Sequence, residues 1–512
     1  MPLFSFPLSA SLLVVVLALG VIIRAHFKAR KYNHLVWSGT SSRTAFGLLY
    51  ARVRNTIYMR QNYQSAVDNY PSKGQACFMP DVLKDTIILP AEELEWPRDP
   101  HTLTDPYIVQ RHEPHHKGIS RDLTRRLGDL TQDIFDELST SIDEEWGKHT
   151  GQWTEINPYT TMLKVVFRTG NRIFIGPKLC RNQEFMEETL GFANSVVPNA
   201  ILIRQLPRFL RPSMIPLITM KNKRHRRRVT EIIMPEVLAR QAMIRGDSEQ
   251  KLNSKPNDFL QWLTEAAELS ERDRDRVPKV ICGRLKVVNF AAIHTTTITS
   301  TNVIFDLISS PSSQDVIDIL RREAANAFAT NNNTWTKQGI NQMSKIDSPL
   351  KESFRLGSLS AYGLLRAVVK KGGITTPHSN TYLPEGATVG IAAQAIHHDP
   401  EIYPEPNEYR PFPFAELRAE ATAKLEGGTA GILKAANLAF PSVSPTFQAF
   451  GFGKHACLGR FFAASMLKLL LAYIVQHYEF QMLKRRPDRT WIGPNIICPM
   501  DLTVRVKRRR LS

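Results

Sequence analysis

The sequence predicts a mainly α-helical catalytic domain with small β-sheets, preceded by one transmembrane helix. Three observations lead to this fold class. The chain starts with an uncharged apolar run, apolar residues then recur at three- and four-residue spacing over long stretches, and strand-like segments are few and short. The 512 residues, 43% of them hydrophobic, are enough for a large core.

The apolar run covers residues 3–23 and is long enough to cross a bilayer, since about twenty helical residues at ~1.5 Å each span its core. Basic residues follow it at once, and by the positive-inside rule they place the rest of the chain in the cytosol. A cleaved signal peptide is the alternative, but it normally has a shorter apolar core and a basic start. The expected organisation is a transmembrane anchor over 1–23, a linker over 24–50 and a catalytic domain over 51–512.

Helical and strand patterns are clearest in a few segments. Helices are predicted over 124–146, 182–197, 229–244, 281–307 and 461–478. Strands are predicted at 86–89, 387–392 and 502–506. The helix over 281–307 differs from the others because it is apolar along its length and rich in small and β-branched residues.

Charge and cysteine content narrow the range of partners. The net charge of +18 is compatible with nucleic acid, an anionic membrane or an acidic protein. The basic runs at 221–228 and 507–510 lack interleaved aromatic residues and a recognisable nucleic-acid fold, so no nucleic-acid partner is expected. We interpret both runs as solvated faces, with lipid headgroups or an acidic redox partner as alternatives. The five cysteines show no Cys-x-x-Cys spacing, which argues against a disulfide framework or a zinc ribbon.

The most informative stretch is the glycine-rich segment at 450–459, FGFGKHACLG, which ends at the start of a predicted helix. Its glycines allow backbone conformations closed to other residues. A thiolate at Cys457 would lie near helix N-terminal amides, which favour negative charge and suit a metal ligand. A buried structural cysteine is the alternative.

This segment resembles the haem-binding loop of cytochromes P450, with the pattern Phe-x-x-Gly-x-(Arg/His)-x-Cys-x-Gly. The matching positions are Phe450, Gly453, His455, Cys457 and Gly459. The resemblance covers roughly residues 50–506. It implies the P450 fold and a haem b whose iron is bound by the Cys457 thiolate, with His455 and Lys454 near a haem propionate. It also implies that the segment 415–444 is an inserted surface segment.

The segment at 290–297, FAAIHTTT, resembles the oxygen-activating stretch of the P450 I-helix. The resemblance implies that Thr295 helps to deliver protons, with Thr296 beside it and His294 in place of the usual acid. A histidine titrates near neutral pH and can relay protons, although a hydrogen-bonded core histidine remains the alternative. The form Ala-Ala-Ile-His-Thr-Thr is similar to fungal P450s of secondary metabolism, several of which act on terpenoid skeletons.

Glu352 and Arg355 lie three residues apart on a predicted helix and resemble the Glu-x-x-Arg of the P450 K-helix. The resemblance implies a buried ion pair of structural importance. The family supplies a third partner, an arginine, at the position where Pro413 stands here. Arg410 or Arg418 is a candidate replacement, or the triad is incomplete.

Three arginines open the helix that follows the histidine pair at 115–116. They are Arg121, Arg125 and Arg126. By its order along the chain, the resemblance implies that this helix corresponds to the P450 C-helix, which would supply a propionate-binding cation. The family's Trp-x-x-x-Arg is absent here. Arg121 and Arg125 are the candidates, and a solvated helix face is the alternative. The histidine pairs at 115–116 and 397–398 have no third ligand at fitting spacing, so no zinc site is expected.

The chain shows no nicotinamide-, flavin- or ATP-binding motif, so its electrons must come from another protein. The resemblance implies a monooxygenase of the endoplasmic reticulum membrane that acts on a lipophilic small molecule. NADPH-cytochrome P450 reductase would be the electron donor, with cytochrome b5 as a further candidate. A haem-thiolate isomerase or dehydratase without reductase electrons, and a non-enzymatic membrane haem-binding protein, are the alternatives. The motif around Thr295 argues against both.

Overall fold

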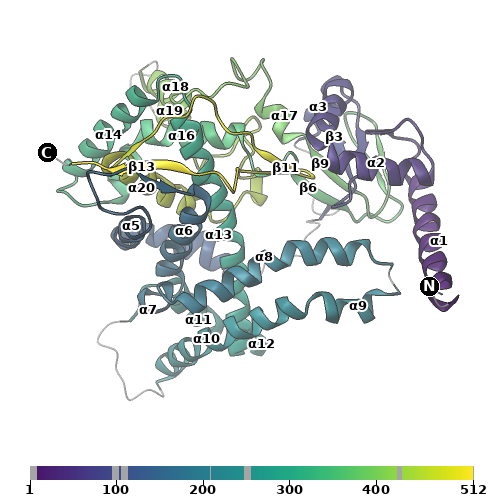
Figure 1. Cartoon of the computed structure of the whole chain (residues 1–512), viewed down its shortest axis with the longest axis horizontal. Coiled ribbons are helices and arrows are strands. Elements are labelled where there is room, and N and C mark those ends of the chain that lie inside the picture. Colours follow the sequence, from purple (N-terminus) through teal and green to yellow (C-terminus); the bar gives the residue numbers. More distant parts are fainter. Residues whose placement is uncertain are drawn as a thin grey trace, which may run out of the picture.

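The computed structural model in Figure 1 describes most of the chain. The described ranges are 8–94, 103–104, 114–207, 209–246, 255–423 and 429–510. Within them, the side chains of residues 8–17, 103–104, 114, 429–430 and 454 are not described.

Helices account for most of the described residues. The α-helices are α1 (Leu8–Lys31), α2 (Ala45–Ile57), α3 (Met59–Asn69), α4 (Pro114–Lys117), α5 (Thr124–Trp146), α6 (Pro158–Phe174), α7 (Pro177–Cys180), α8 (Gln183–Gln205), α9 (Arg211–Ile218), α10 (Met220–Arg245), α11 (Phe259–Glu268), α12 (Asp273–Arg276), α13 (Pro278–Ile308), α14 (Ser313–Ala329), α15 (Lys337–Gln342), α16 (Ser344–Leu356), α17 (Ala393–His397), α18 (Pro413–Ala423), α19 (Thr429–Asn437) and α20 (Arg460–His477). The 3₁₀ turns are η1 (Pro71–Lys73), η2 (Ala91–Glu93) and η5 (Gly453–His455), and η4 (Gly118–Leu123) is a π-helix.

The described strands form small sheets. They are β1 (Val36–Trp37), β2 (Cys77–Met79), β3 (Thr86–Leu89), β4 (Leu103–Thr104), β5 (Thr154–Ile156), β6 (Gly363–Val368), β7 (Ile374–Thr375), β8 (Tyr382–Leu383), β9 (Thr388–Ile391), β10 (Tyr478–Phe480), β11 (Thr490–Ile492), β12 (Asn495–Ile497) and β13 (Val504–Arg508). A six-stranded sheet has the order β1-β2-β3-β9-β6-β4, with β1/β2 and β3/β9 parallel. A three-stranded sheet has the order β10-β13-β5, and β11/β12 and β7/β8 are hairpin-like pairs. The predicted mainly helical fold with small sheets is confirmed.

The main core lies among the long helices. Buried side chains of α5, α6, α13, α16 and α20 form one continuous cluster, and α13 crosses it in contact with α6, α10 and α16 (Figure 1). Because α13 meets neighbours on several sides, its buried residues are spread around the helix, which explains the absence of one distinct polar face. This central helix positions the candidate site.

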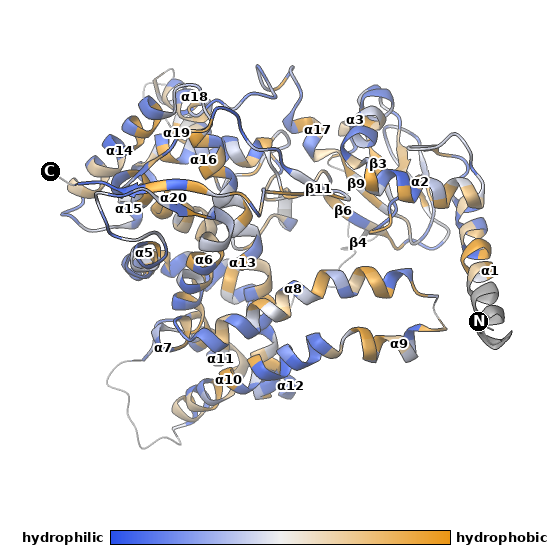
Figure 2. Cartoon of the chain, in the orientation of Figure 1, coloured by the Kyte–Doolittle hydropathy of each residue, from blue (hydrophilic) through white to orange (hydrophobic). Residues whose placement is uncertain are grey.

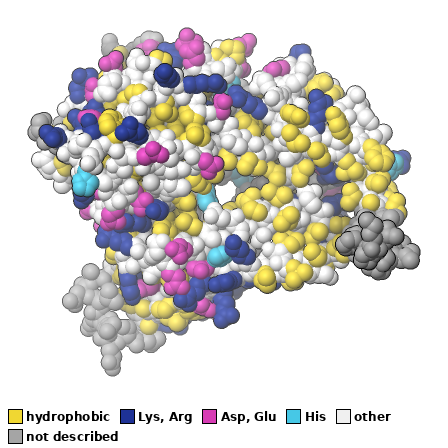
Figure 3. Space-filling view, in the orientation of Figure 1, with side chains coloured by type: hydrophobic (Ala, Val, Ile, Leu, Met, Phe, Trp, Pro, Cys, Tyr) yellow, Lys and Arg dark blue, Asp and Glu magenta, His cyan; other side chains and the backbone are white. Residues whose placement is uncertain are grey.

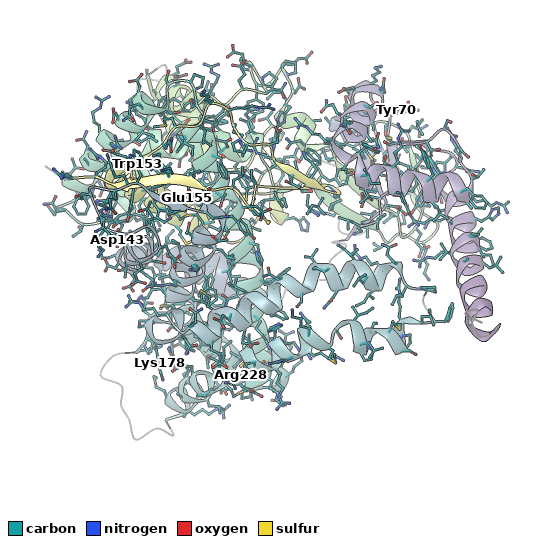
Figure 4. The ribbon with its side chains drawn as sticks, in the orientation of Figure 1. Tyr70, Asp143, Trp153, Glu155, Lys178 and Arg228 are labelled. Atoms are coloured by element: carbon teal, nitrogen blue, oxygen red, sulfur yellow. The ribbon has the colours of Figure 1, made fainter. Side chains whose placement is uncertain are left out.

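The predicted elements fit the structure to different degrees. The helix expected over 124–146 is α5, and the strand expected at 86–89 is β3, with the same bounds. The helix expected over 229–244 is longer, because α10 already begins at Met220 and includes the basic run at 221–228. Acids on the neighbouring α8 pair with that run: His225 contacts Glu188, and Arg228, labelled in Figure 4, contacts Glu184. Ion pairs between two helices cannot be predicted from the residue spacing within one helix.

The segment 24–50, expected to be a linker, is part of the folded structure. Ala25 and Ala29 of α1 and Trp37 of β1 pack in a second cluster with apolar residues of the six-stranded sheet. Residues 1–7 of the expected anchor lie outside the described residues. Where the structure describes side chains, we find no helix that combines the length and apolarity needed to cross a membrane.

The inserted segment at 415–444 contains most of α18 and the whole of α19, and α18 packs on α16. A buried carboxylate holds this segment in place. Asp347 of α16 accepts hydrogen bonds from the Phe440 backbone N–H (2.7 Å), from Lys468 of α20 (3.0 Å) and from Arg418 of α18 (3.4 Å). The insertion is therefore anchored to the same helix that carries the predicted ion pair.

Candidate active site

The cysteine loop has the shape that its glycines permit. Gly451 and Gly453 adopt φ values of 78° and 64°, in the left-handed region that favours glycine. The Cys457 N–H then donates to the Phe450 carbonyl oxygen at 2.7 Å, which closes the loop. Gly459 is the N-cap of α20, as expected from the sequence. The loop thus presents Cys457 just before the start of a long buried helix.

Cys457 differs from the other cysteines of the chain. It is exposed, whereas Cys77, Cys180, Cys282 and Cys498 are buried. Burial nevertheless raises the pKa of the Cys457 thiol, opposed by the backbone N–H of Gly459 and by the charge of Arg460. The sulfur of Cys457 is therefore accessible, although its surroundings disfavour the charged thiolate.

The loop is seated on α16 by aromatic contacts. The ring of Phe450 lies 4.8 Å from that of Phe354 in an edge-to-face arrangement and 5.2 Å from that of Phe440. Phe354 belongs to α16, between Glu352 and Arg355. The position of the loop therefore depends on the orientation of α16.

The predicted ion pair is formed and fully buried. Arg355 donates twice to the Glu352 carboxylate, at 2.8 Å each, and both side chains are at most 3% exposed. The remaining guanidinium N–H groups donate to the carbonyl oxygens of His397, Pro406 (2.8 Å) and Glu408 (3.5 Å). A buried pair is stable only when such further bonds complete it.

Neither candidate arginine acts as the third side chain of this pair within the described chain. The Arg410 guanidinium lies 3.7 Å from Glu405, and only the Arg410 backbone N–H approaches Glu352, at 3.4 Å. Arg418 contacts Asp347 instead. Pro413, at the position expected for the arginine, is the first residue of α18. Backbone carbonyl oxygens that accept hydrogen bonds from Arg355 take the place of a third charged side chain here.

His397 is a functional residue that the sequence did not reveal. Its carbonyl oxygen accepts a hydrogen bond from Arg355, and its ring Nε2 accepts one from the Gln448 backbone N–H at 2.9 Å. The ring also stacks on Phe447, with centroids 5.6 Å apart. His397 therefore connects the ion pair to the start of the cysteine loop. No local pattern indicates this role, because Gln448 lies 51 residues further along the chain.

An accessible stripe interrupts the buried surface of α13. Ala291 and Thr295 are exposed, as is Val287 one turn earlier, whereas most of the helix is buried. Residues four apart share a helix face, so these three side chains line one side of α13. The Thr295 hydroxyl donates to the Ala291 carbonyl oxygen at 2.8 Å. The predicted oxygen-site threonine thus lies on the accessible side of a helix whose other sides are packed in the core.

The other two residues predicted beside Thr295 differ from each other. His294 is half-buried, and desolvation lowers its pKa, which keeps the imidazole neutral at neutral pH. Its Nε2 has no hydrogen-bond partner among the described residues. Thr296 is buried and does not share the exposure of Thr295. Of the two, His294 is better placed to exchange a proton.

The predicted propionate-binding cations are not all gathered at the loop. His455 is half-buried within it, whereas the Lys454 side chain lies outside the described part of the chain. Arg121 is exposed and pairs with Asp122 at 2.9 Å, and Arg125 is also exposed. The structure therefore gives Arg121 and Arg125 surface positions.

A further cation near the loop was missed by sequence reasoning. Arg366 of β6 is 5% exposed and donates to the Leu365 carbonyl oxygen at 2.7 Å. It lies on the same buried face of the strand as Leu364 and Val368, which share a cluster with Phe452 of the cysteine loop. A lone arginine in a strand gives no signal in the sequence.

The residues present fit a haem bound through a thiolate. Cys457, the only cysteine with accessible surface, stands in a glycine-rich loop that folds tightly on itself. At Gly451, a side chain would meet only backbone atoms within 4 Å. The accessible stripe at Thr295 and the unpartnered Nε2 of His294 supply polar groups on a second element. A thiolate ligand must be deprotonated, so metal binding would lower the pKa of Cys457, which burial raises.

The buried ion pair generates a first prediction. Arg355→Met should lower the free energy of unfolding by about 3–5 kcal/mol and reduce haem content, because Glu352 would remain buried without compensation. Urea denaturation and the haem absorbance of purified protein measure both effects. The control is Arg485→Met, which breaks an exposed pair with Asp488 at the same three-residue spacing and should cost less than about 1 kcal/mol. Equal effects of the two substitutions would contradict this role of the pair.

The buried histidines generate a second prediction. Desolvation lowers the pKa of His397 to about 3 and those of His398 and His477 to about 4, so the unfolded chain binds protons that the folded chain excludes. Stability should therefore be highest above about pH 6.5, the ordinary histidine pKa, and fall as the pH drops from there toward 4.

His397→Gln should reduce that slope by about 1.4 kcal/mol per pH unit, because one proton fewer is taken up on unfolding. Unfolding free energies measured in urea between pH 7 and pH 4 test it. The exposed His149, changed to glutamine, serves as the control and should leave the slope as it is. An unchanged slope in His397→Gln would show that His397 is protonated in the folded protein.

Comparisons with known proteins agree with this geometry. The sequence model of the family described as Cytochrome P450 matches residues 102–500. The chain is 30% identical to cytochrome P450 monooxygenase gloP of Glarea lozoyensis, over 98% of this chain and 95% of that protein. It is 28% identical to cytochrome P450 monooxygenase polB of Polytolypa hystricis, over 90% of each chain. It is 27% identical to cytochrome P450 monooxygenase astC of Aspergillus terreus, over 96% of this chain and 94% of that protein. With the thiolate loop, the buried ion pair and the accessible stripe of α13 in place, this chain belongs to the cytochrome P450 family and is a haem-thiolate monooxygenase.

Proposed function

We propose that this enzyme hydroxylates or otherwise oxidises a lipophilic small molecule, a terpenoid or a related secondary metabolite. It uses O₂ and electrons passed from NADPH by cytochrome P450 reductase, with cytochrome b5 as a second donor. The observation that carries the proposal is the presence of two accessible groups on elements packed in the main helical core, Cys457 on the loop before α20 and Thr295 on α13. The form of the segment at 290–297 supports the terpenoid class.

Different residues would hold the haem iron, bind the haem carboxylates and leave space for oxygen and substrate. Cys457 would hold the haem iron, and the bound haem supplies the oxidising power for attack on a C–H bond. Arg366 and His455 are candidates to bind the haem carboxylates. The accessible stripe of α13 leaves room for oxygen and for one edge of the substrate, because Ala291 carries only a methyl group.

Two side chains of α13 could move a proton. The Thr295 hydroxyl donates to the Ala291 carbonyl oxygen, and rotation about χ1 would turn its O–H toward the open side of the stripe. His294 is neutral, and its unpartnered Nε2 could take up a proton and pass it on. Proton delivery would then depend on a hydroxyl and an imidazole in place of a carboxylic acid.

The apolar run at 3–23 and the cations after it support a single-pass anchor in the endoplasmic reticulum membrane, with the catalytic domain in the cytosol. A lipophilic substrate partitions into such a membrane. The basic net charge of +18 would attract an acidic reductase domain, an effect that weakens as salt is added.

Replacement of the ligand tests the cofactor site. Cys457→Ala should abolish the thiolate-type absorbance of the reduced, CO-treated protein and all NADPH-dependent product formation. Cys180→Ala removes a buried thiol outside the loop and should keep the absorbance band. A band that persists without Cys457 would refute the assignment of the ligand.

Replacement of Thr295, whose hydroxyl lies on the accessible stripe of α13, tests proton delivery. Thr295→Ala should lower product formed per NADPH by at least about tenfold, since a positioned proton donor contributes about 10²–10⁴-fold, while NADPH consumption continues and hydrogen peroxide accumulates. Thr299→Ala loses the same kind of bond, from its hydroxyl to the Thr295 carbonyl oxygen at 2.8 Å, and should stay coupled. Equal coupling in both variants would remove Thr295 from the reaction.

The substrate class is tested by expressing the chain with a reductase in a fungal host and comparing extracted metabolites. We expect one terpenoid-type compound to be consumed and a product heavier by one oxygen atom to appear. With ¹⁸O₂ the new oxygen should carry the label. A product formed without NADPH and without label would favour the isomerase or dehydratase alternative.

A further inference from the structure

A cavity lies where α1 meets the connection between α8 and α9, apart from the cysteine loop. Its volume is about 1020 Å³, near the upper end of the range for small-molecule sites. Most of its lining comes from α1 and its end (residues 20–32), from the turn at 81–85, and from residues 204, 205, 207, 209 and 211 around the connection between α8 and α9. Residues 49, 52 and 53 of α2 and residues 367, 386 and 388 at the six-stranded sheet complete it. In Figure 1 the α8–α9 hairpin points toward the lower end of α1.

The lining of this cavity is strongly basic. Six of its side chains are Lys or Arg and two are Asp, and burial raises the pKa of one of these, Asp81, to about 6. The other, Asp85, is shared by two cations. Lys28 and Arg52 both contact its carboxylate. The cavity therefore carries an excess of positive charge.

Two of the arginines have no acidic partner in the described structure. Arg204 donates to the Leu83 carbonyl oxygen at 2.9 Å. Arg211 donates to the carbonyl oxygens of Leu206 at 3.1 Å and of Arg204 at 3.2 Å. Both guanidinium groups are held in place by backbone oxygens, and their remaining N–H groups can donate to an anion.

The rim of the cavity is apolar. Three exposed hydrophobic side chains line it, Val21, Val53 and Phe209. Further exposed hydrophobic side chains lie on the same elements: Leu19, Ile23 and Phe27 on α1, Leu202 on α8 and Leu217 on α9. Figure 2 shows hydrophobic segments on α9, on the end of α8 and on α1, and Figure 3 shows yellow side chains gathered over the same region. A basic cavity inside an apolar rim matches a molecule with an anionic head and apolar chains.

We propose that this cavity binds the headgroup of an anionic phospholipid, with Arg204 and Arg211 on its phosphate and the apolar rim against its acyl chains. The proposal rests on the membrane anchor put forward above, since the apolar run at 3–23 extends into α1, which begins at Leu8. Cations near a bilayer surface favour anionic lipids by about 1 kcal/mol each, so two arginines without counter-ions are a substantial source of selectivity.

The proposal can be tested with the full-length haem-containing protein in phosphatidylcholine nanodiscs. Trace amounts of spin-labelled phosphatidylserine or phosphatidylcholine are added, and electron paramagnetic resonance gives the fraction of each label immobilised by the protein. We expect the labelled phosphatidylserine to be preferred by at least about fivefold, the factor that one cation contributes. A ratio near one would overturn the proposal.

Variants locate the preference. Arg204→Gln/Arg211→Gln should bring the ratio close to one, whereas Arg204→Lys/Arg211→Lys, which keeps both charges, should retain most of it. The matched control is Lys178→Gln/Arg485→Gln. It removes the same charge at two highly exposed side chains, and Figure 4 places Lys178 at the far end of the molecule from α1. A preference that survives in the first variant, or that disappears in the control, would overturn the assignment to this cavity.

Two further readouts separate the outcomes. Inorganic phosphate at matched ionic strength should leave the lipid ratio unchanged, and displacement of the label by low phosphate concentrations would overturn the lipid assignment in favour of a soluble anion. The CO-treated absorbance band should be the same in all variants, which shows that the haem site is intact. If neither label is immobilised, the membrane anchor itself fails, whereas immobilisation without selectivity overturns the headgroup site alone.

Discussion

The Arg355 guanidinium is the constraint on which the active site depends. It is buried with Glu352, and its other N–H groups bind carbonyl oxygens of segments that are distant in the sequence. One of these carbonyls belongs to His397, whose ring accepts the Gln448 N–H just before the cysteine loop. The pair therefore acts less as a source of net stability than as a fixed point from which the position of Cys457 follows.

Much of this arrangement could be predicted from the sequence, because its strongest signals are local. The spacing of apolar residues gave the bounds of α5, since one face of that helix is buried along its whole length. Glu352 and Arg355 could be paired because residues three apart share a helix face. Cys457 could be chosen among five cysteines because glycines surround it, and glycines at 451 and 453 are indeed needed for positive φ.

The remaining features could not be predicted because they depend on contacts between distant segments. The role of His397 needs a backbone N–H from another loop, and the buried position of Arg366 depends on how β6 packs against the cysteine loop. The replacement of a third charged partner by carbonyl oxygens depends on the path of the chain between α17 and α18. The longer α10 follows from acids on α8 that neutralise its basic start, a pairing that no single helix encodes.

The contrast among the five cysteines has a practical consequence. Burial raises the pKa of Cys77, Cys180 and Cys498 to about 12 and that of Cys282 to about 11, so these thiols are both shielded and protonated. An alkylating reagent would therefore reach a single sulfur, and only while no iron occupies it. The fraction of molecules that gain the mass of the reagent would report how much of a preparation lacks its prosthetic group, without any absorbance measurement.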